Sequence, residues 1–255
     1  RSEWLQDGGL KVFLDGSLGG HTALLREPYC DHGDKSAHSH GQRIWTDEEL
    51  DRHFGAAHAA GVQVHAHAIG DGAIDQGLAA FHRLAARSDL EGKGWGQNAL
   101  RHRFEHFEIV HDDQVARAVE LGLVSSSQPN FVGEWSAKGG MYHARLGDRF
   151  LLNNRFRDFK EAGLPLAFGS DGMPFGPLPG LASAVHHPEE SQRLEPLEAA
   201  WHYTWMAAWS LRWPGLGHLA PGNPADLVAL DGDPTGSPRE WKVVQTVTGG
   251  VPRLP

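Results

Sequence analysis

The sequence lacks the usual marks of a secreted or membrane-bound protein. Cysteine occurs once among 255 residues, at Cys30, which excludes an internal disulfide framework. No apolar run approaches the length of a membrane-spanning helix. The chain opens on Arg1, and no signal peptide is visible. We therefore expect a cytoplasmic protein with no membrane partner.

Basic residues are also in short supply. Lysine and arginine total 23 against 32 aspartates and glutamates, a formal charge of -9 that argues against a nucleic-acid partner. The apolar fraction of 40% is ordinary for a globular protein, so the chain can bury a substantial core. Histidine is the exception, with 17 residues. Their positions must decide whether they are metal ligands or surface imidazoles.

Strand-like and helix-like segments alternate about five times, which favours parallel strands in βα units. Strands are predicted over residues 10–16, 62–70, 99–110, 123–131 and 164–174. Helices are predicted over residues 46–61, 71–87, 111–122, 147–163 and 195–212. Residues 216–255 differ, because short strands there are separated by Pro-Gly, Asp-Gly and Gly-Gly turns. This tail predicts a small all-β unit.

The stretch HAHAIGDGAI, residues 65–74, places two histidines ahead of a tight turn. Alternate residues of a strand share a face, so His65 and His67 lie together, opposite Val64. The polar face would look into the interior of a sheet or barrel. In α/β proteins the chemistry lies at the carboxyl ends of the strands, and His67 is nearest that end. A hydrogen-bonded core histidine remains the alternative for either residue alone.

Other strands place chemically active side chains at comparable positions. Lys11 lies on the first strand, His106 near the end of the third and Asp171 at the end of the fifth. Imidazole and carboxylate groups suit zinc and similar divalent metals. A lysine amine in such a pocket would be desolvated and would lose its proton easily. Together with His67, these residues predict a metal site at one end of the sheet.

Several motifs resemble the amidohydrolase superfamily, most closely its amidohydrolase-3, YtcJ-like branch, which includes N-substituted formamide deformylases. They are KVFLDGSLGGHTALLREPYCD, HAHAIGD, RHRFEHFEIV, SSSQPNF, FGSDGMPFGPLPGLASAV and LAPGNPADLVALDGDP. The resemblance covers nearly the whole chain and implies a metal-dependent (β/α)8 TIM-type barrel with a small β-sandwich. It assigns residues 1–215 to the carboxyl-terminal portion of the barrel and residues 216–255 to the sandwich. It further implies hydrolysis of C–N bonds in small amide-like substrates.

The resemblance also implies roles for the four strand-end residues. Lys11 matches the lysine that carbon dioxide carboxylates and that bridges two metals. His67 and His106 match two histidine ligands. Asp171 matches the aspartate that ligates metal and handles the proton of the attacking water. The expected cofactor is a divalent metal, zinc in the first instance, as one or two ions.

Residues near these positions have less specific interpretations. Asp15, Ser17 and His21 follow the first strand and are candidate substrate contacts, although the family commonly carries arginine where this chain has His21. His102 and Arg103 are expected to line the barrel or to brace Glu105 as structural residues.

The tryptophans at 201, 205 and 209 are spaced by four. That spacing predicts a helix face that packs on the barrel.

One feature of the family barrel has no counterpart here. The family begins with a His-x-His strand ahead of the lysine strand, whereas only ten residues precede Lys11. Five βα units are also fewer than the eight of a closed barrel. We therefore expect a fragment that associates with the missing amino-terminal segment or with another copy, as a homo-oligomer. The alternative to a hydrolase is a non-catalytic partial barrel that binds metal or acts as a scaffold.

Overall fold

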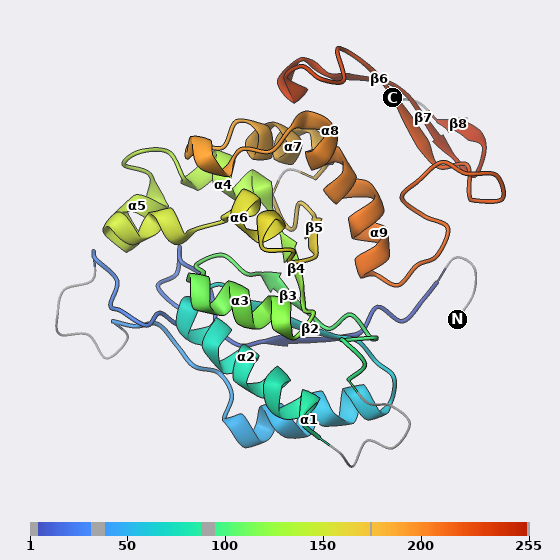
Figure 1. Cartoon of the computed structure of the whole chain (residues 1–255). Coiled ribbons are helices and arrows are strands. Elements are labelled where there is room, and N and C mark those ends of the chain that lie inside the picture. The colour runs from blue at the N-terminus through green and yellow to red at the C-terminus, as the bar shows by residue number, and fades with distance from the viewer. Residues whose placement is uncertain (1–4, 32–38, 88–94, 174, 254–255) are drawn as a thin grey trace.

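The computed structural model describes residues 5–31, 39–87, 95–173 and 175–253. Its centre is a five-stranded parallel sheet whose strands lie side by side in chain order. The strands are β1 (Leu10–Phe13), β2 (Val64–Ala68), β3 (Arg103–His106), β4 (Val124–Ser127) and β5 (Leu166–Phe168). Helices separate successive strands (Figure 1). The predicted α/β architecture of sequential βα units is confirmed.

The first three helices begin and end close to their predicted limits. They are α1 (Asp47–Ala59), α2 (Asp71–Ala85) and α3 (Asp112–Glu120). The start of α1 is a capping box, in which the Glu49 amide donates to the Thr46 hydroxyl and the Glu49 carboxylate accepts from the Thr46 amide. These helices cover one face of the sheet (Figure 1), and the core lies between them. Val64, Phe81 and Phe104 are among its buried residues.

The chain after β4 contains more helix than the sequence predicted. The strand expected over 123–131 ends at Ser127, and α4 (Pro129–Trp135) begins within the rest of that segment, whereas α5 (Met141–Leu146) and α7 (Pro177–Val185) lie in segments expected to be loops. The single helix expected over 147–163 is a 3-10 turn η1 (Gly147–Leu152) followed by α6 (Phe156–Glu161). A short 3-10 turn η2 (Glu190–Gln192) precedes the next helix. Helices this short carry too few turns for a periodic apolar pattern to be recognised.

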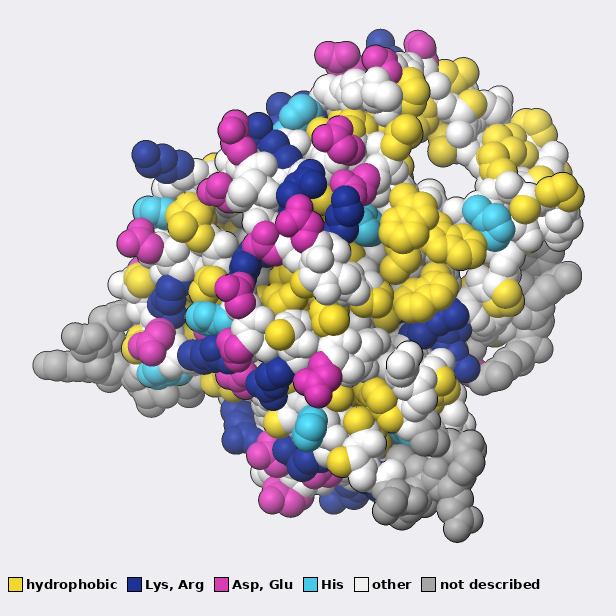
Figure 2. Space-filling view, in the orientation of Figure 1, with side chains coloured by type: hydrophobic (Ala, Val, Ile, Leu, Met, Phe, Trp, Pro, Cys, Tyr) yellow, Lys and Arg dark blue, Asp and Glu magenta, His cyan; other side chains and the backbone are white. Residues whose placement is uncertain are grey.

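The predicted packing of the tryptophan face on the barrel holds only in part, because Trp205 and Trp209 are half-buried and Trp201 is exposed. The segment consists of α8 (Pro196–Trp201), the π-helical turn η3 (His202–Met206) and α9 (Ala207–Ser210). Trp201 is 46% exposed, whereas the neighbouring face of the helix, which carries His202 and Met206, is buried. The face with His202 is turned toward the sheet, and the Nδ1 atom of His202 donates to the carbonyl oxygen of Leu166 in β5 at 2.8 Å. Figure 2 shows hydrophobic side chains gathered on the surface over α9.

The carboxyl-terminal strands form a separate antiparallel sheet in the order β6-β7-β8 (Figure 1). They are β6 (Leu227–Asp231), β7 (Lys242–Thr248) and β8 (Val251–Arg253), with the 3-10 turn η4 (Pro238–Glu240) before β7. This agrees with the all-β tail expected from the sequence; the domain boundary at residue 216 stays a prediction. In the described parts of the chain, no helix has both the length and the apolar character that crossing a membrane requires.

The face of the sheet opposite the first three helices carries polar side chains. Strand register aligns Lys11 with His65 and then Arg103, and aligns Phe13 with His67 and then Glu105. Residues in register on neighbouring parallel strands project from the same face. Two rows of polar and aromatic groups therefore lead toward the carboxyl ends of the strands.

Candidate active site

A cavity of about 480 Å3 opens at the carboxyl ends of the parallel strands. Lys11, His67, His106 and Asp171 all contribute to its lining. They come from β1, β2, β3 and the turn after β5. The structure thus brings the four predicted residues to one place, the end of a βα sheet where active sites form. Their role as metal ligands stays a prediction.

His67 lies close to the end of β2 and is held by the loop that follows β1. Its Nε2 donates to the carbonyl oxygen of Gly16 at 2.8 Å. Because a carbonyl can only accept, the proton is on Nε2 and the lone pair is on Nδ1. Burial lowers the pKa of His67, so the ring is neutral near pH 7. A neutral imidazole is the form that binds metal.

His106 reaches the same cavity through an unusual backbone conformation. Alternation along β3 would place it on the helix-covered face with Phe104, because Glu105 shares the face of His67. The backbone at His106 is instead left-handed, with φ of 74°, and the ring centroids of His67 and His106 are 4.4 Å apart. Asp171 is also left-handed, with φ of 52°. Such residues store about 1–3 kcal/mol each and occur often at functional sites.

The electrostatic surroundings of His106 favour a neutral ring. Burial lowers its pKa to about 3, and nearby His67 and Lys11 act in the same direction. Its Nε2 lies 3.9 Å from Oδ2 of Asp171. Its Nδ1 is buried and has no hydrogen-bond partner among the described residues. The Nε2 atom therefore faces a carboxylate across the cavity.

Lys11 reaches the cavity along the exposed side of β1. Its Nζ lies 5.0 Å from the centroid of the Phe13 ring. Burial lowers the pKa of Lys11, while the charges of Glu105 and Asp171 oppose this effect. The net shift favours the uncharged amine.

Arg103 and Glu105 form an ion pair on the sheet face that carries His65 and His67. Arg103 Nε donates to Oε1 of Glu105 at 2.6 Å, so Arg103 does brace Glu105 as expected. His65 Nε2 lies 3.1 Å from Oε1 of Gln63 and is not part of the cavity lining. His102 does not contact Glu105 in the same way, but its expected structural role is confirmed, because it is fully buried. It packs among aromatic rings of the core, 5.4 Å from the Trp95 ring, and Val64 N–H donates to its Nδ1.

The three candidate substrate contacts have different surroundings. Ser17 contributes to the cavity lining. Asp15 is 0% exposed and lies outside the lining, and its carboxylate accepts from the backbone amides of Leu24, Ile69 and Gly70. His21 also lies outside the lining; its Nε2 is 3.0 Å from Asp31. Only Ser17 is placed to contact a molecule in the cavity.

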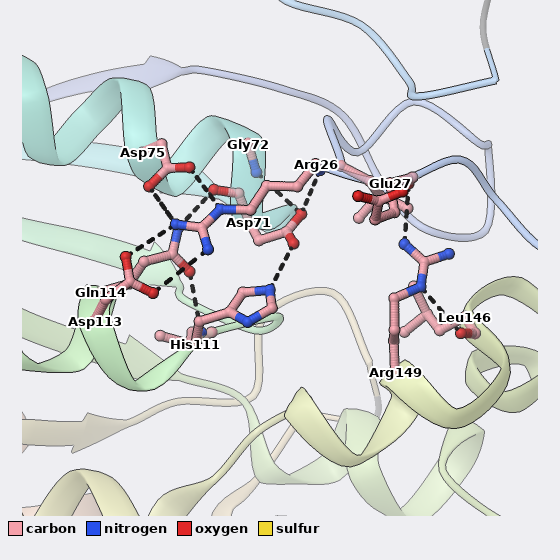
Figure 3. Close-up of polar contacts among 12 residues, drawn as sticks. Arg26, Glu27, Asp71, Gly72, Asp75, His111, Asp113, Gln114, Leu146 and Arg149 are labelled. Carbon is pink, nitrogen blue, oxygen red and sulfur yellow. Dashed lines mark hydrogen bonds and ion pairs between the residues drawn. The ribbon is translucent and has the colours of Figure 1, made fainter.

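A polar network joins the loop that carries Ser17 to α2 and α3 (Figure 3). Arg26 bridges Asp75 of α2 at 2.7 Å and Asp113 of α3 at 3.1 Å. The buried carboxylate of Asp71 accepts from the Arg26 backbone amide at 2.8 Å and contacts His111 Nε2 at 3.0 Å. Sequence reasoning missed this network, because its members are far apart in the chain.

Sequence reasoning also missed one side of the cavity. Phe131 and Trp135 of α4, Met141 and Tyr142 of α5, and Glu108 after β3 contribute to the lining. The Tyr142 hydroxyl donates to Oε2 of Glu108 at 2.9 Å, and burial raises the pKa of Glu108 to about 8. The aromatic residues of NFVGEW, directly after the serine strand, were the available signal.

The donor atoms in the cavity suit a divalent metal. Neutral imidazoles and a carboxylate are typical zinc ligands, and Nε2 of His106 faces the Asp171 carboxylate at 3.9 Å. The contacts occur as pairs, His67 with His106 and His106 with Asp171. Within the described residues, no group of three or more histidine, cysteine, aspartate or glutamate side chains is arranged to hold a metal. The chemistry fits, but further ligands are needed to close the site.

Comparisons with known proteins agree with this chemistry. A sequence model of the amidohydrolase family matches residues 1–253. The Bacillus subtilis (strain 168) protein named “Putative amidohydrolase YtcJ” is 32% identical over 248 residues, covering 91% of this chain and 43% of that protein. Protein LONG AFTER FAR-RED 3 of Arabidopsis thaliana is 29% identical over 251 residues, covering 90% of this chain and 39% of that protein. The chain thus spans less than half the length of these curated relatives.

Solved structures extend the likeness to the fold. An uncharacterized metal-dependent hydrolase from Pyrococcus horikoshii OT3 superposes with a TM-score of 0.75 at 30% identity, covering 91% of this chain and 46% of that one. A similar hydrolase from Pyrococcus furiosus gives a TM-score of 0.74 at 31% identity, covering 89% and 44%.

Proposed function

The chain belongs to the amidohydrolase family, and on that premise we propose that it forms part of a metal-dependent hydrolase that cleaves a C–N bond in an amide or formamide-like substrate. The observation that carries this proposal is the common cavity of Lys11, His67, His106 and Asp171. Separate elements contribute these residues: His67, His106 and Asp171 lie at the carboxyl ends of their strands, and Lys11, the second residue of β1, lines the same cavity. The metal-dependent hydrolases with similar structures support the same chemistry.

We propose that Asp171 ligates the metal together with His67, His106 and Lys11. His67 would use Nδ1, because Gly16 occupies its Nε2. His106 would use Nε2, which faces Asp171. Lys11, carboxylated by carbon dioxide, would contribute a bridging anion, and its lowered pKa favours the amine form that reacts. A bound divalent ion, zinc in this proposal, lowers the pKa of coordinated water and polarises the scissile carbonyl.

Asp171 is the proposed catalytic residue. Its side chain is 52% exposed and lies beside His106, so it can face both the metal and a substrate in the cavity. A carboxylate in this position accepts the proton of the attacking water and returns it to the leaving amine. Ser17 is placed to orient the substrate from the loop after β1.

The remaining ligands are proposed to come from beyond this sheet. Among the described strands, β1 and β5 are edge strands, whereas a closed barrel has none. Phe13 on β1 is 50% exposed, an unusual position for a phenylalanine that faces a barrel interior. We propose that an amino-terminal segment or a second copy in a homo-oligomer covers this surface and supplies a His-x-His pair, and that the assembly works in the cytoplasm.

Metal content and turnover test the proposal together. The chain together with the proposed source of the His-x-His pair should bind one or two metal ions and hydrolyse members of an amide and formamide panel. His106→Ala should lower both quantities, while His82→Ala, a change to an exposed residue of α2, should lower neither. Among the described residues, the candidate ligands meet only in pairs and no three of them are arranged around one point. This observation favours one alternative, a non-catalytic partial barrel. Metal binding without turnover on any amide would establish that alternative.

A further inference from the structure

The cavity has two chemically different walls. The sheet wall carries the polar groups already described. The other wall is formed by Leu18 of the loop after β1 and by residues of α4 and α5, and these side chains are apolar or aromatic. They are Leu18, Phe131, Trp135, Met141 and Tyr142. The proposed chemistry uses the sheet wall and Ser17, which leaves the apolar wall without a role.

The apolar wall begins directly beside the reactive end of the cavity. The Phe131 ring stacks on the ring of His106, with centroids 5.9 Å apart and planes 15° from parallel. Trp135 follows, 4.8 Å from Phe131, and Tyr142 lies 5.9 Å beyond Trp135. A group packed on this wall would therefore be attached close to the bond that is cleaved.

The wall is held in place by its surroundings. Tyr142 is 1% exposed and donates to the buried carboxylate of Glu108. Asn130, which precedes Phe131, donates from Nδ2 to the carbonyl oxygen of Ser170 at 2.8 Å, next to Asp171. Such anchors keep an aromatic surface rigid before a ligand arrives, which lowers the entropy lost on binding.

The charges around the cavity favour an uncharged group on this wall. Of the described residues that line it, Lys11 is the only lysine or arginine, and it belongs to the sheet wall. A carboxylate carried toward the apolar wall would lose its hydration without gaining a cationic partner, which is unfavourable. A volume of about 480 Å3 is ample for a ring-sized substituent.

We propose that the wall formed by Leu18, Phe131, Trp135, Met141 and Tyr142 is a specificity subsite for an uncharged aryl or bulky alkyl group next to the scissile bond. The inference rests on the proposed function for the reaction but concerns binding. It predicts substrates that are neutral aromatic or bulky alkyl amides, and it disfavours amides with a carboxylate on that side.

Ketones test the subsite without hydrolysis, because they present a carbonyl but no leaving amine. Binding of 4-phenyl-2-butanone, acetone and 4-oxopentanoate would be measured by calorimetry on the chain with its metal and the proposed source of the His-x-His pair. The phenyl ketone should bind at least about tenfold more tightly than acetone, as expected for burial of a ring. The carboxylate ketone should show no gain over acetone.

Substitutions in the apolar wall test whether its side chains cause the preference for the phenyl ketone. Trp135→Ala should remove most of the preference for the phenyl ketone, and Met141→Ala should reduce it. Trp135→Phe should retain much of it, which separates loss of the ring from loss of the fold. Trp201→Ala is the matched control, because Trp201 is exposed on α8 and lies outside the cavity.

Equal binding of acetone and the phenyl ketone to the unaltered protein would overturn the subsite. So would tighter binding of the carboxylate ketone, or a preference that survives both Trp135→Ala and Met141→Ala. A preference lost in Trp135→Ala, in a protein that hydrolyses no amide, would support the subsite and contradict only the proposed reaction.

Discussion

His67 donates from Nε2 to the carbonyl oxygen of Gly16 at 2.8 Å, so the loop after β1 determines which nitrogen of this imidazole is free. Gly16 itself has no room for a side chain, since an added Cβ would lie 2.0 Å from Oγ1 of Thr22. The identity of a loop glycine is therefore linked to the tautomer of a proposed metal ligand. Hydrogen bonds of this kind orient ligating histidines and tune their affinity.

The first prediction concerns this contact. Gly16→Ala should displace the carbonyl, lower metal affinity by roughly 10–100-fold as other losses of such support do, and destabilise the fold by about 1–3 kcal/mol. Metal titration and denaturant unfolding measure the two effects. Gly8→Ala is the control, because its added Cβ meets nothing within 4 Å. Unchanged metal affinity in Gly16→Ala would contradict the role given to this carbonyl.

The second prediction uses the left-handed backbone of His106. Both His106→Ala and His106→Gly remove the imidazole and should abolish its metal contribution. In metal-free protein, His106→Gly should be more stable than His106→Ala by about 1 kcal/mol, because glycine adopts a φ of 74° without steric cost. Chemical denaturation of the two variants checks the order. If alanine were the more stable residue, the strain at this position would be refuted.

The third prediction concerns the network that fastens the loop after β1. Asp71→Ala should cost about 1–2 kcal/mol, because it leaves the partly buried Arg26 amide and His111 without the Asp71 carboxylate as acceptor. Asp112→Ala, at a carboxylate that is 88% exposed, should change stability by less than about 0.5 kcal/mol. Urea unfolding compares them. Similar costs for both would show that Asp71 does not anchor the loop.

The fourth prediction is a pH dependence of stability. Burial lowers the pKa of His102 to about 3, with His58, Arg212 and His65 acting in the same direction, against an ordinary value of 6.5. The neutral ring therefore contributes fully above pH 6.5, and its contribution is lost as the pH falls from there toward 3. The slope added by this one group approaches about 1.4 kcal/mol per pH unit.

Unfolding free energies across that range measure the slope. His102→Phe keeps a ring in the aromatic core and should flatten the dependence, although it leaves the Val64 amide unpaired and lowers stability at neutral pH. His82→Phe, on the exposed side of α2, should leave the slope unchanged. A residual slope is expected in His102→Phe, because burial also lowers the pKa of His106 to about 3. A slope as steep as that of the unaltered protein would assign it to other groups.

Local patterns in the sequence were enough for the first half of the fold. The alternation of strand and helix signals, the capping box at Thr46 and the two-residue period around His67 are each formed by neighbours in the chain. The same reasoning placed Lys11, His67 and Asp171 at strand ends, because parallel strands in βα units end at one edge. These interactions are short in sequence, so a pattern of a few residues specifies them.

The tertiary structure decided what depends on contacts between distant segments. Alternation along β3 puts His106 on the helix-covered face, and only its left-handed backbone brings the ring to His67. The apolar wall of α4 and α5 and the helix face with His202 that is turned toward the sheet likewise depend on packing partners far along the chain. A backbone angle that costs energy is retained only where surrounding packing holds it, and no local run of residues encodes that packing.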